Sequence, residues 1–304
     1  MTTPEMITTE TVNPRFADID VWPIEEAVEA MLEGQLSAIA AIKSQVSGIA
    51  RASEAAASRL MQGGRLIYAG AGTSGRIAVQ DGVELGPTYG WPARRLGFVL
   101  AGGEGALAES VEGAEDDADD ARNQIASLNL TTFDVVVGVA ASGGTPFTVA
   151  AIEAARTLGA LTIAVTNNAG TALPAAAEHA LVAETGSELV AGSTRMKAGT
   201  AQKAVLNLLS TAMMIRCGRV YRGLMVNMVV SNDKLRQRAY GMVSQLAGCS
   251  NDVAKTMLGA ADGDIKTAVL MAMGHSRDVA IASLAAHGEN LRCAIDSLTG
   301  RGAE

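Results

Sequence analysis

The chain has 304 residues, of which 48% are hydrophobic, so it can bury the core of one large domain or of two unequal ones. Its formal net charge of −8 argues against a broad surface for nucleic acid or for anionic membranes, because both are bound through clustered Lys and Arg. No apolar stretch approaches the roughly 18 to 20 residues of a membrane span, and the first ten residues lack the basic start and apolar core of a signal peptide. Three well-separated cysteines without CxxC spacing favour neither a disulfide nor a zinc site. We therefore expect a soluble cytoplasmic protein.

A helical pattern covers residues 22 to 62, where apolar side chains recur at three- to five-residue steps and where Gly34 or Gly48 could divide it into more than one helix. From residue 65 the pattern alternates between strands and helices. Short apolar runs predict five strands, at 65–71, 94–102, 134–142, 160–168 and 179–185, and helical patterns follow the first three, up to about 84, over 105–128 and over 145–159. This alternation predicts an α/β fold with a parallel five-stranded sheet flanked by helices.

A long helix is predicted over about 194–217, and the helical pattern continues after it without clear strands. Three short helices are predicted near the C-terminus, with breaks at 259–263 and near His275. We divide the chain accordingly into an N-terminal segment with packing helices (1–62), a sheet domain (63–239) and a small helical C-terminal domain (240–304).

Two turns between a strand and a helix have similar sequences, GAGTSGR from residue 70 and AASGGTP from residue 140. The first N–H groups of a helix have no internal partner, and the helix dipole adds partial positive charge there. Glycine allows a ligand to approach the backbone, and hydroxyls add hydrogen bonds, here from Thr73, Ser74, Ser142 and Thr145. The two turns therefore predict a phosphate site built from oriented dipoles in an acidic protein. The alternative is that they are ordinary N-caps.

A third helix start of this kind is predicted in GSTRMKAGTAQK, residues 192 to 203. Ser193 and Thr194 are expected at its N-cap, and Arg195 and Lys197 follow directly.

These three stretches resemble the sugar isomerase (SIS) domain, which binds phosphosugars. The fuller pattern adds DGVELGPTYG and VEGAEDD and runs from about residue 9 to the C-terminus. It is similar to the family of N-acetylmuramic acid 6-phosphate etherases. The resemblance implies a three-layer sandwich and cleavage of the D-lactyl ether, giving N-acetylglucosamine 6-phosphate and D-lactate by elimination of lactate and addition of water. It also implies a role in recycling cell-wall amino sugars, no metal or redox cofactor, and a homodimer with the site near the subunit interface.

The resemblance places two acid/base glutamates at Glu84 and Glu115. We expect Glu84 to protonate the lactyl oxygen and Glu115 to remove the proton at C2, although the roles could be exchanged. Glu84 follows Ser74 by ten residues, so it should lie near the C-terminal end of a helix with Asp81 one turn away, and both features should raise its pKa. Glu115 is one of six acids within nine residues, which should raise some pKa values in that run. By pattern alone, both positions are also typical of solvated carboxylates on a helix.

The resemblance also suggests the residues that hold the substrate. The phosphate anchor is expected at Ser74, Ser142 and Thr145, with help from Thr73, Gly143 and Ser193. Glu188 is expected to contact sugar hydroxyls, and Lys197 and Arg195 to meet the phosphate or the lactyl carboxylate. The chain departs from the family at Gly144, where an arginine is common. The three histidines have no ligand spacing, so no metal site is expected.

Two other functions would suit the same patterns. An aldose–ketose phosphosugar isomerase on this fold would also need a base beside an opened carbonyl, but it would release no D-lactate. A non-catalytic phosphosugar sensor would share the fold, and a DNA-binding sensor should carry a basic helix-turn-helix before the first strand. Residues 22 to 62 are not notably basic, which disfavours that version.

Overall fold

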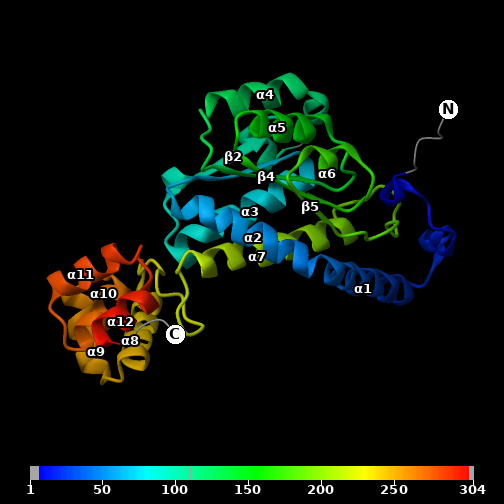
Figure 1. Ribbon diagram of the computed structural model, residues 1–304. Helices are drawn as coiled ribbons and strands as arrows, with labels where there is room; N and C mark the ends of the chain where they lie inside the picture. Colours follow the sequence, from blue (N-terminus) through cyan, green and yellow to red (C-terminus); the bar gives the residue numbers. More distant parts are fainter. Residues whose placement is uncertain (1–6, 110, 301–304) are drawn as a thin grey trace. The chain divides into compact units, whose positions relative to one another are not determined.

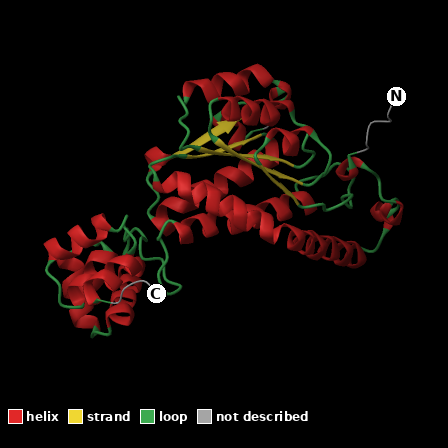
Figure 2. Ribbon diagram, in the orientation of Figure 1, coloured by secondary structure: helices red, strands yellow, loops and turns green. Residues whose placement is uncertain are grey.

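The computed structural model describes residues 7–109 and 111–300. Within these residues, short runs that are mostly buried form a single sheet, as expected for strands covered on both faces (Figure 2). The strands are β1 (Leu66–Gly70), β2 (Leu96–Leu100), β3 (Val135–Ala140), β4 (Leu161–Thr166) and β5 (His179–Val182). All neighbours are parallel, in the order β2-β1-β3-β4-β5. The predicted parallel five-stranded sheet is confirmed.

Helices cover both faces of the sheet (Figure 1). On one face lie α4 (Ala118–Ser127), α5 (Pro146–Thr157) and α6 (Ala172–Ala176), whose small apolar side chains pack closely on the strands. On the other face lie α2 (Val46–Met61), the first part of α3 (Gly72–Tyr89) and α7 (Lys197–Arg216). This arrangement is the predicted three-layer sandwich.

The N-terminal helical pattern forms α1 (Ile24–Ala41) and α2, joined by a 3-10 turn at Ile42–Gln45. The prediction that Gly34 or Gly48 divides the helix is wrong. A Cβ at Gly34 would lie 2.9 Å from the side chain of Leu189, and one at Gly48 would lie 3.2 Å from that of Leu181. These glycines therefore allow close packing inside helices. In the described residues before α1, from residue 7 on, three short 3-10 turns lie at Thr8–Glu10, Pro14–Phe16 and Ile19–Val21.

The acidic segment 105–128 is helical only in its second half, so the predicted continuous helix is wrong. Its described first half contains 3-10 turns at Glu104–Leu107 and Ala114–Asp116, and another such turn lies at Ala93–Arg95. Gly113 adopts a left-handed conformation, with φ of 73°, and the Asp117 carboxylate then accepts a hydrogen bond from the Asp120 N–H at 2.9 Å. Asp117 thus caps a new helix, α4, and separates it from the loop.

The C-terminal part of the chain is helical, with α8 (Asp233–Ala247), α9 (Asn251–Ala260), α10 (Ile265–Ala272), α11 (Arg277–Ala286) and α12 (Leu291–Thr299). The pattern predicts three short helices after residue 240, whereas α9 to α12 and the end of α8 lie there. Each of the five begins at a capping side chain that accepts an N–H within its first turn, at Asn232, Ser250, Asp264, Ser276 and Asn290. None of the described helices combines the length and apolar character needed to cross a membrane.

The chain forms two compact units. Unit 1 comprises residues 1–82 and 94–213 and contains the sheet, whereas unit 2 comprises 83–93 and 214–304 and contains the end of α3 with the C-terminal helices. The predicted boundary at 239/240 falls inside α8, and the N-terminal helices share unit 1 with the sheet because α2 packs on β3, β4 and β5. The division into an N-terminal segment (1–62), a sheet domain (63–239) and a C-terminal helical domain (240–304) stays a prediction.

Candidate functional site

The strand order places the two predicted phosphate turns side by side. From β1 the chain crosses to β2 on one side of the sheet, whereas β3 lies on the other side of β1. Ligands of open α/β sheets bind at such a reversal, beyond the carboxyl ends of the strands. Gly70 pairs with Val139 in the parallel register, so the turns after β1 and β3 leave the sheet at the same level.

The turn after β1 is tight because two glycines meet in it. A Cβ at Gly70 would lie 3.0 Å from the Cα atom of Gly75, and the Gly75 N–H donates to the carbonyl oxygen of Ala71 at 3.0 Å. Ser74 is 8% exposed and lies in the first turn of α3, with Thr73 half-buried beside it. The first N–H groups of α3 therefore open at the carboxyl edge of the sheet.

The turn after β3 requires glycine for a different reason. Gly143 has a φ of +70°, and a Cβ there would lie 2.1 Å from Oγ1 of Thr171 and 2.7 Å from Oγ1 of Thr166. Ser142 Oγ accepts the Gly144 N–H at 3.2 Å. Thr145 occupies the N-cap position of α5, but its side chain accepts no hydrogen bond from the helix. The ordinary N-cap interpretation therefore does not hold for Thr145.

The third predicted helix start differs from the other two. α7 begins at Lys197, so the prediction that Ser193 and Thr194 form its N-cap is wrong. The carboxylate of Glu188, which is fully buried, accepts the N–H groups of Lys197 at 3.0 Å and of Ala198 at 2.9 Å. This carboxylate occupies the N–H groups that an anion would use. Ser193 lies in the preceding turn, where its N–H donates to the Val190 carbonyl oxygen at 2.9 Å.

Lys197 is held by its own loop. Its Nζ donates to the Ser187 carbonyl oxygen at 2.9 Å. Burial lowers the pKa of this ammonium, and the nearby charge of Glu188 offsets only part of that effect. Glu188 and Lys197 therefore stabilise the start of α7, and the burial of Glu188 leaves no side-chain surface for sugar hydroxyls.

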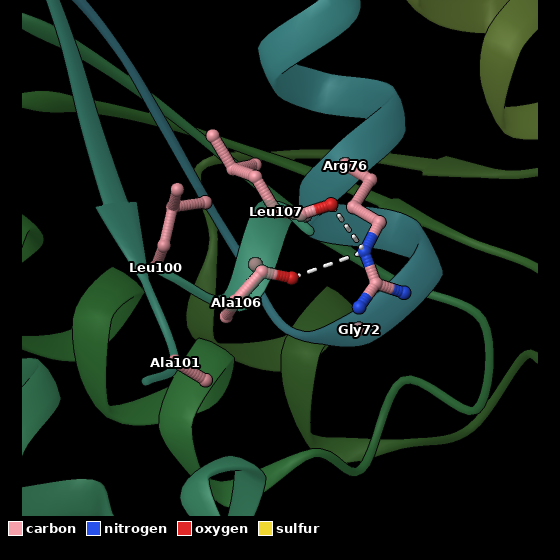
Figure 3. A pocket seen from close by; sticks show the side chains of 8 residues that line it. Gly72, Arg76, Leu100, Ala101, Ala106 and Leu107 are labelled. Atoms are coloured by element: carbon pink, nitrogen blue, oxygen red, sulfur yellow. Dashed lines mark hydrogen bonds between the residues drawn. The ribbon is translucent and has the colours of Figure 1, made fainter. Parts of the chain in front are cut away.

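Glu115 lies in the loop that follows β2, and Arg76 ties the first part of this loop to α3. The Arg76 Nε donates to the carbonyl oxygens of Ala106 at 3.0 Å and of Leu107 at 3.2 Å (Figure 3). The hollow between them has a volume of about 10 Å³, enough for about one water. Glu115 itself is exposed and lies in the 3-10 turn Ala114–Asp116. Arg76 is part of the GAGTSGR motif, but the sequence of this motif does not indicate that Arg76 binds a loop about 30 residues away.

Glu84 is exposed on α3, ten residues after Ser74. It belongs to unit 2, whereas the turn residues and Glu115 belong to unit 1. Asp81, expected one turn away, is buried and accepts hydrogen bonds from the Tyr68 hydroxyl at 2.7 Å and the Asn207 amide at 2.6 Å. Burial raises the pKa of Tyr68 well above its ordinary value, and the charge and hydrogen bond of Asp81 add to this rise.

A contact that sequence reasoning did not find joins the N-terminal segment to the β3 turn. The Asn168 Nδ2 donates to the Ala141 carbonyl oxygen at 2.9 Å, and its Oδ1 accepts the Thr8 N–H at 2.9 Å. Thr9 is completely buried beside it. The Asn167-Asn168 pair directly after β4 was the available signal, since polar side chains at the carboxyl end of a buried strand often face a site.

Among the described residues, no group of three or more His, Cys, Asp or Glu side chains is arranged to hold a metal ion. Two family models match the chain, the glucokinase regulatory protein N-terminal SIS domain over residues 48–156 and the SIS domain over residues 114–212. A Streptomyces coelicolor N-acetylmuramic acid 6-phosphate etherase is 44% identical over 97% of this chain and 96% of its own length. The Deinococcus radiodurans protein of the same name is 43% identical over 86% of each chain.

The crystal structure of a Bacteroides fragilis protein assigned as a phosphosugar isomerase involved in capsule formation is similar in fold. It has a TM-score of 0.52 and 18% identity, and the match covers 66% of this chain and 95% of that one.

Proposed function

The chain belongs to the family of N-acetylmuramic acid 6-phosphate etherases, so it cleaves the ether bond of that phosphosugar, and we propose which residues do so. The observation that supports the assignment most is similarity at 42–45% identity over most of the chain. We place the reaction in the cytoplasm, since none of the three cysteines of the chain forms a disulfide, as is typical of a reducing compartment. Its products suit the recycling of cell-wall amino sugars.

The reaction begins with an opened sugar ring, because an unactivated ether resists direct hydrolysis. The C1 aldehyde makes the proton on C2 removable, and a base takes it. The electron pair left on C2 forms a C2–C3 double bond while the C3–O bond breaks and an acid protonates the departing lactate oxygen. Water then adds at C3 of the unsaturated aldehyde, and a proton returns to C2. The site must therefore supply a base, an acid and an anchor for the phosphate.

The phosphate binds the two helix starts at the strand reversal. Ser74, Ser142 and Thr145 contribute hydroxyls, and Thr73 and Gly143 bring the backbone close. Support comes from the paired register of β1 and β3 and from the unused capping position of Thr145. The start of α7 is left out, because Glu188 already occupies its N–H groups. Ser193, Lys197 and Arg195 are then at most peripheral to the phosphate.

Glu115 is the base at C2, and Glu84 is the acid for the lactate oxygen. Glu115 lies on a loop from the carboxyl end of β2, next to β1 in the sheet. A phosphate bound by the first N–H groups of α3 lies beyond the N-terminal end of the helix. Glu84 lies ten residues after Ser74, which is about 15 Å along the helix toward its C-terminal end. We therefore assign the acid at each site to Glu84 of the partner subunit in a homodimer.

A second copy of the chain is also suggested by an exposed apolar face on unit 1. Exposed side chains recur along α1 at three- to four-residue steps, at Ile24, Val28, Leu32, Leu36 and Ile39. Ile24 is 77% exposed and Leu36 is 64% exposed. A helix with such a stripe normally buries it, and a homodimer interface would do so.

Isotope labelling tests the reaction. With the substrate in water enriched in heavy oxygen, we expect label in the C3 hydroxyl of N-acetylglucosamine 6-phosphate and none in D-lactate. Label in lactate would show that a different bond is cut. Isomerised sugar phosphate without lactate would indicate the isomerase instead.

Subunit mixing tests the assignment of the two glutamates. Glu84→Gln and Glu115→Gln proteins are each expected to be inactive in lactate release. After unfolding and refolding together, about half of the dimers are mixed, and each mixed dimer has one intact site, so activity should return to about a quarter of the wild-type value. If both glutamates of one site come from one subunit, the mixture stays inactive. A refolded wild-type sample is the control.

A further inference from the structure

The last turns of α3 carry Glu84, and this end of the helix is weak by itself. Pro87 lies inside the helix, three residues after Glu84. Proline has no N–H, so the carbonyl of Val83, four residues earlier, loses its usual helical donor. The helix ends at Tyr89, and the next residue, Gly90, has a φ of +60° and donates its N–H to the Gly86 carbonyl oxygen at 2.9 Å. The turn with Glu84 therefore depends on contacts from outside the helix.

Unit 2 supplies these contacts. The Val229 N–H donates to the carbonyl oxygen of Pro87 at 3.2 Å. Nη1 of Arg219 donates to the carbonyl oxygens of Tyr89 at 3.2 Å and of Gly90 at 3.3 Å. Carbonyl groups at a helix C-terminus have no internal donor, and a cation there is favourable with the helix dipole.

Apolar packing fixes the same segment on either side of Glu84. Leu85 is 2% exposed, and Trp91 is 4% exposed with the Arg219 guanidinium 5.6 Å from the centroid of its ring. A Cβ at Gly90 would lie 2.5 Å from the carbonyl oxygen of Asn227, so the backbone of the C-terminal part approaches the helix end directly. Glu84 stays exposed between these buried neighbours.

Arg219 is itself held in place. With its side-chain amide in the orientation that satisfies both of its polar atoms, Asn227 accepts hydrogen bonds from Arg219 Nη1 at 3.3 Å and from Lys266 Nζ at 3.2 Å. Lys266 is 1% exposed and donates to the Glu289 carboxylate at 2.7 Å. These hydrogen bonds, centred on the buried Lys266, connect α10 and the α11–α12 loop to the helix end.

We propose that unit 2 positions Glu84 for proton transfer and that Arg219 is the positioning residue through which it does so. This inference rests on the proposed role of Glu84 as the acid. It gives the C-terminal helices a part in catalysis without direct contact with substrate. Loss of Arg219 should impair the protonation of lactate and leave the base step intact, because Arg219 contacts the helix end that bears Glu84, whereas Glu115 lies on a loop of unit 1.

The experiment compares Arg219→Gln, Arg219→Lys, Glu84→Gln and Arg292→Gln in the full-length protein. Arg292 is the matched control, since it is an exposed arginine of the same unit that stacks on the ring of Tyr221, 4.9 Å from its centroid. Two rates are measured with N-acetylmuramic acid 6-phosphate, the release of D-lactate and the incorporation of deuterium at C2 of recovered substrate in D2O. Thermal unfolding is recorded for each variant.

We expect Arg219→Gln to lower kcat for lactate release by about 10- to 100-fold, with KM and C2 exchange within about twofold of wild type. Arg219→Lys keeps the charge and one hydrogen bond, so its kcat should lie between those of Arg219→Gln and wild type. If Arg219→Gln does not fold, Arg219→Lys takes its place in the comparison. Wild-type lactate release in Arg219→Gln, or equal loss of release and exchange, would overturn the inference. Undiminished lactate release in Glu84→Gln would instead refute the role of Glu84 itself.

Discussion

Replacing Gly143 by alanine should damage the phosphate turn more than any similar change nearby. A residue with a Cβ that adopts the φ of +70° found at Gly143 loses about 1 to 2 kcal/mol of folding free energy relative to glycine. The added methyl would also lie 2.1 Å from Oγ1 of Thr171 and 2.7 Å from Oγ1 of Thr166, and overpacking of this kind costs about 1 to 3 kcal/mol. Together we expect a loss of about 2 to 5 kcal/mol in the free energy of unfolding, with the turn displaced.

Gly144→Ala is the matched control, because Gly144 has no positive φ and a Cβ there would meet only Ser142 Oγ, at 4.0 Å. Its free energy of unfolding should stay within about 0.5 kcal/mol of wild type. Urea unfolding gives the stabilities, and initial rates of D-lactate release give KM. We expect KM to rise by about tenfold or more in Gly143→Ala, because a displaced turn no longer aligns its N–H groups with the phosphate. Equal stability and equal KM in the two variants would refute this account of the turn.

Three further changes test other parts of the structure. Gly144→Arg should lower KM by about tenfold, since a guanidinium adds charged hydrogen bonds to phosphate, and an unchanged KM would place the phosphate elsewhere. Asn168→Ala should cost about 2 kcal/mol in urea unfolding and expose the N-terminal segment to limited proteolysis, because the Thr8 N–H loses its acceptor and the Ala141 carbonyl oxygen loses one of its donors. Burial alone would raise the pKa of Asp134, but hydrogen bonds from Arg65 and from backbone N–H groups hold it below its ordinary value. This stabilisation is present above the unfolded pKa and is lost as pH falls, so Asp134→Asn should be less stable than wild type at pH 7 by about 3 kcal/mol, with the difference shrinking below about pH 4.

The sheet could be predicted because its strands are continuous apolar runs between glycine-rich turns. Residues 134–142, for example, have no alternation, and β3 is buried along its whole length. Helix starts were harder to predict. The start of α7 depends on Glu188, nine residues upstream of Lys197, and such a contact has no local signature. The contact from Asn168 to the N-terminal segment spans 160 residues, so no window of sequence contains it.

The three helix starts show what makes such a position available to an anion. All three combine glycine with Ser or Thr in the sequence, and all three belong to the sheet unit. At the start of α7 a buried carboxylate of the chain itself accepts hydrogen bonds from the first N–H groups, so these groups already bind an anion. At α5 the side chain at the N-cap position accepts no hydrogen bond from the first helical N–H groups. At α3 two glycines let the first turn of the helix lie close to the end of β1. A serine and a glycine before a helix therefore indicate an anion site only where no acidic side chain of the fold reaches the same N–H groups. This condition selects the two turns that adjoin at the strand reversal.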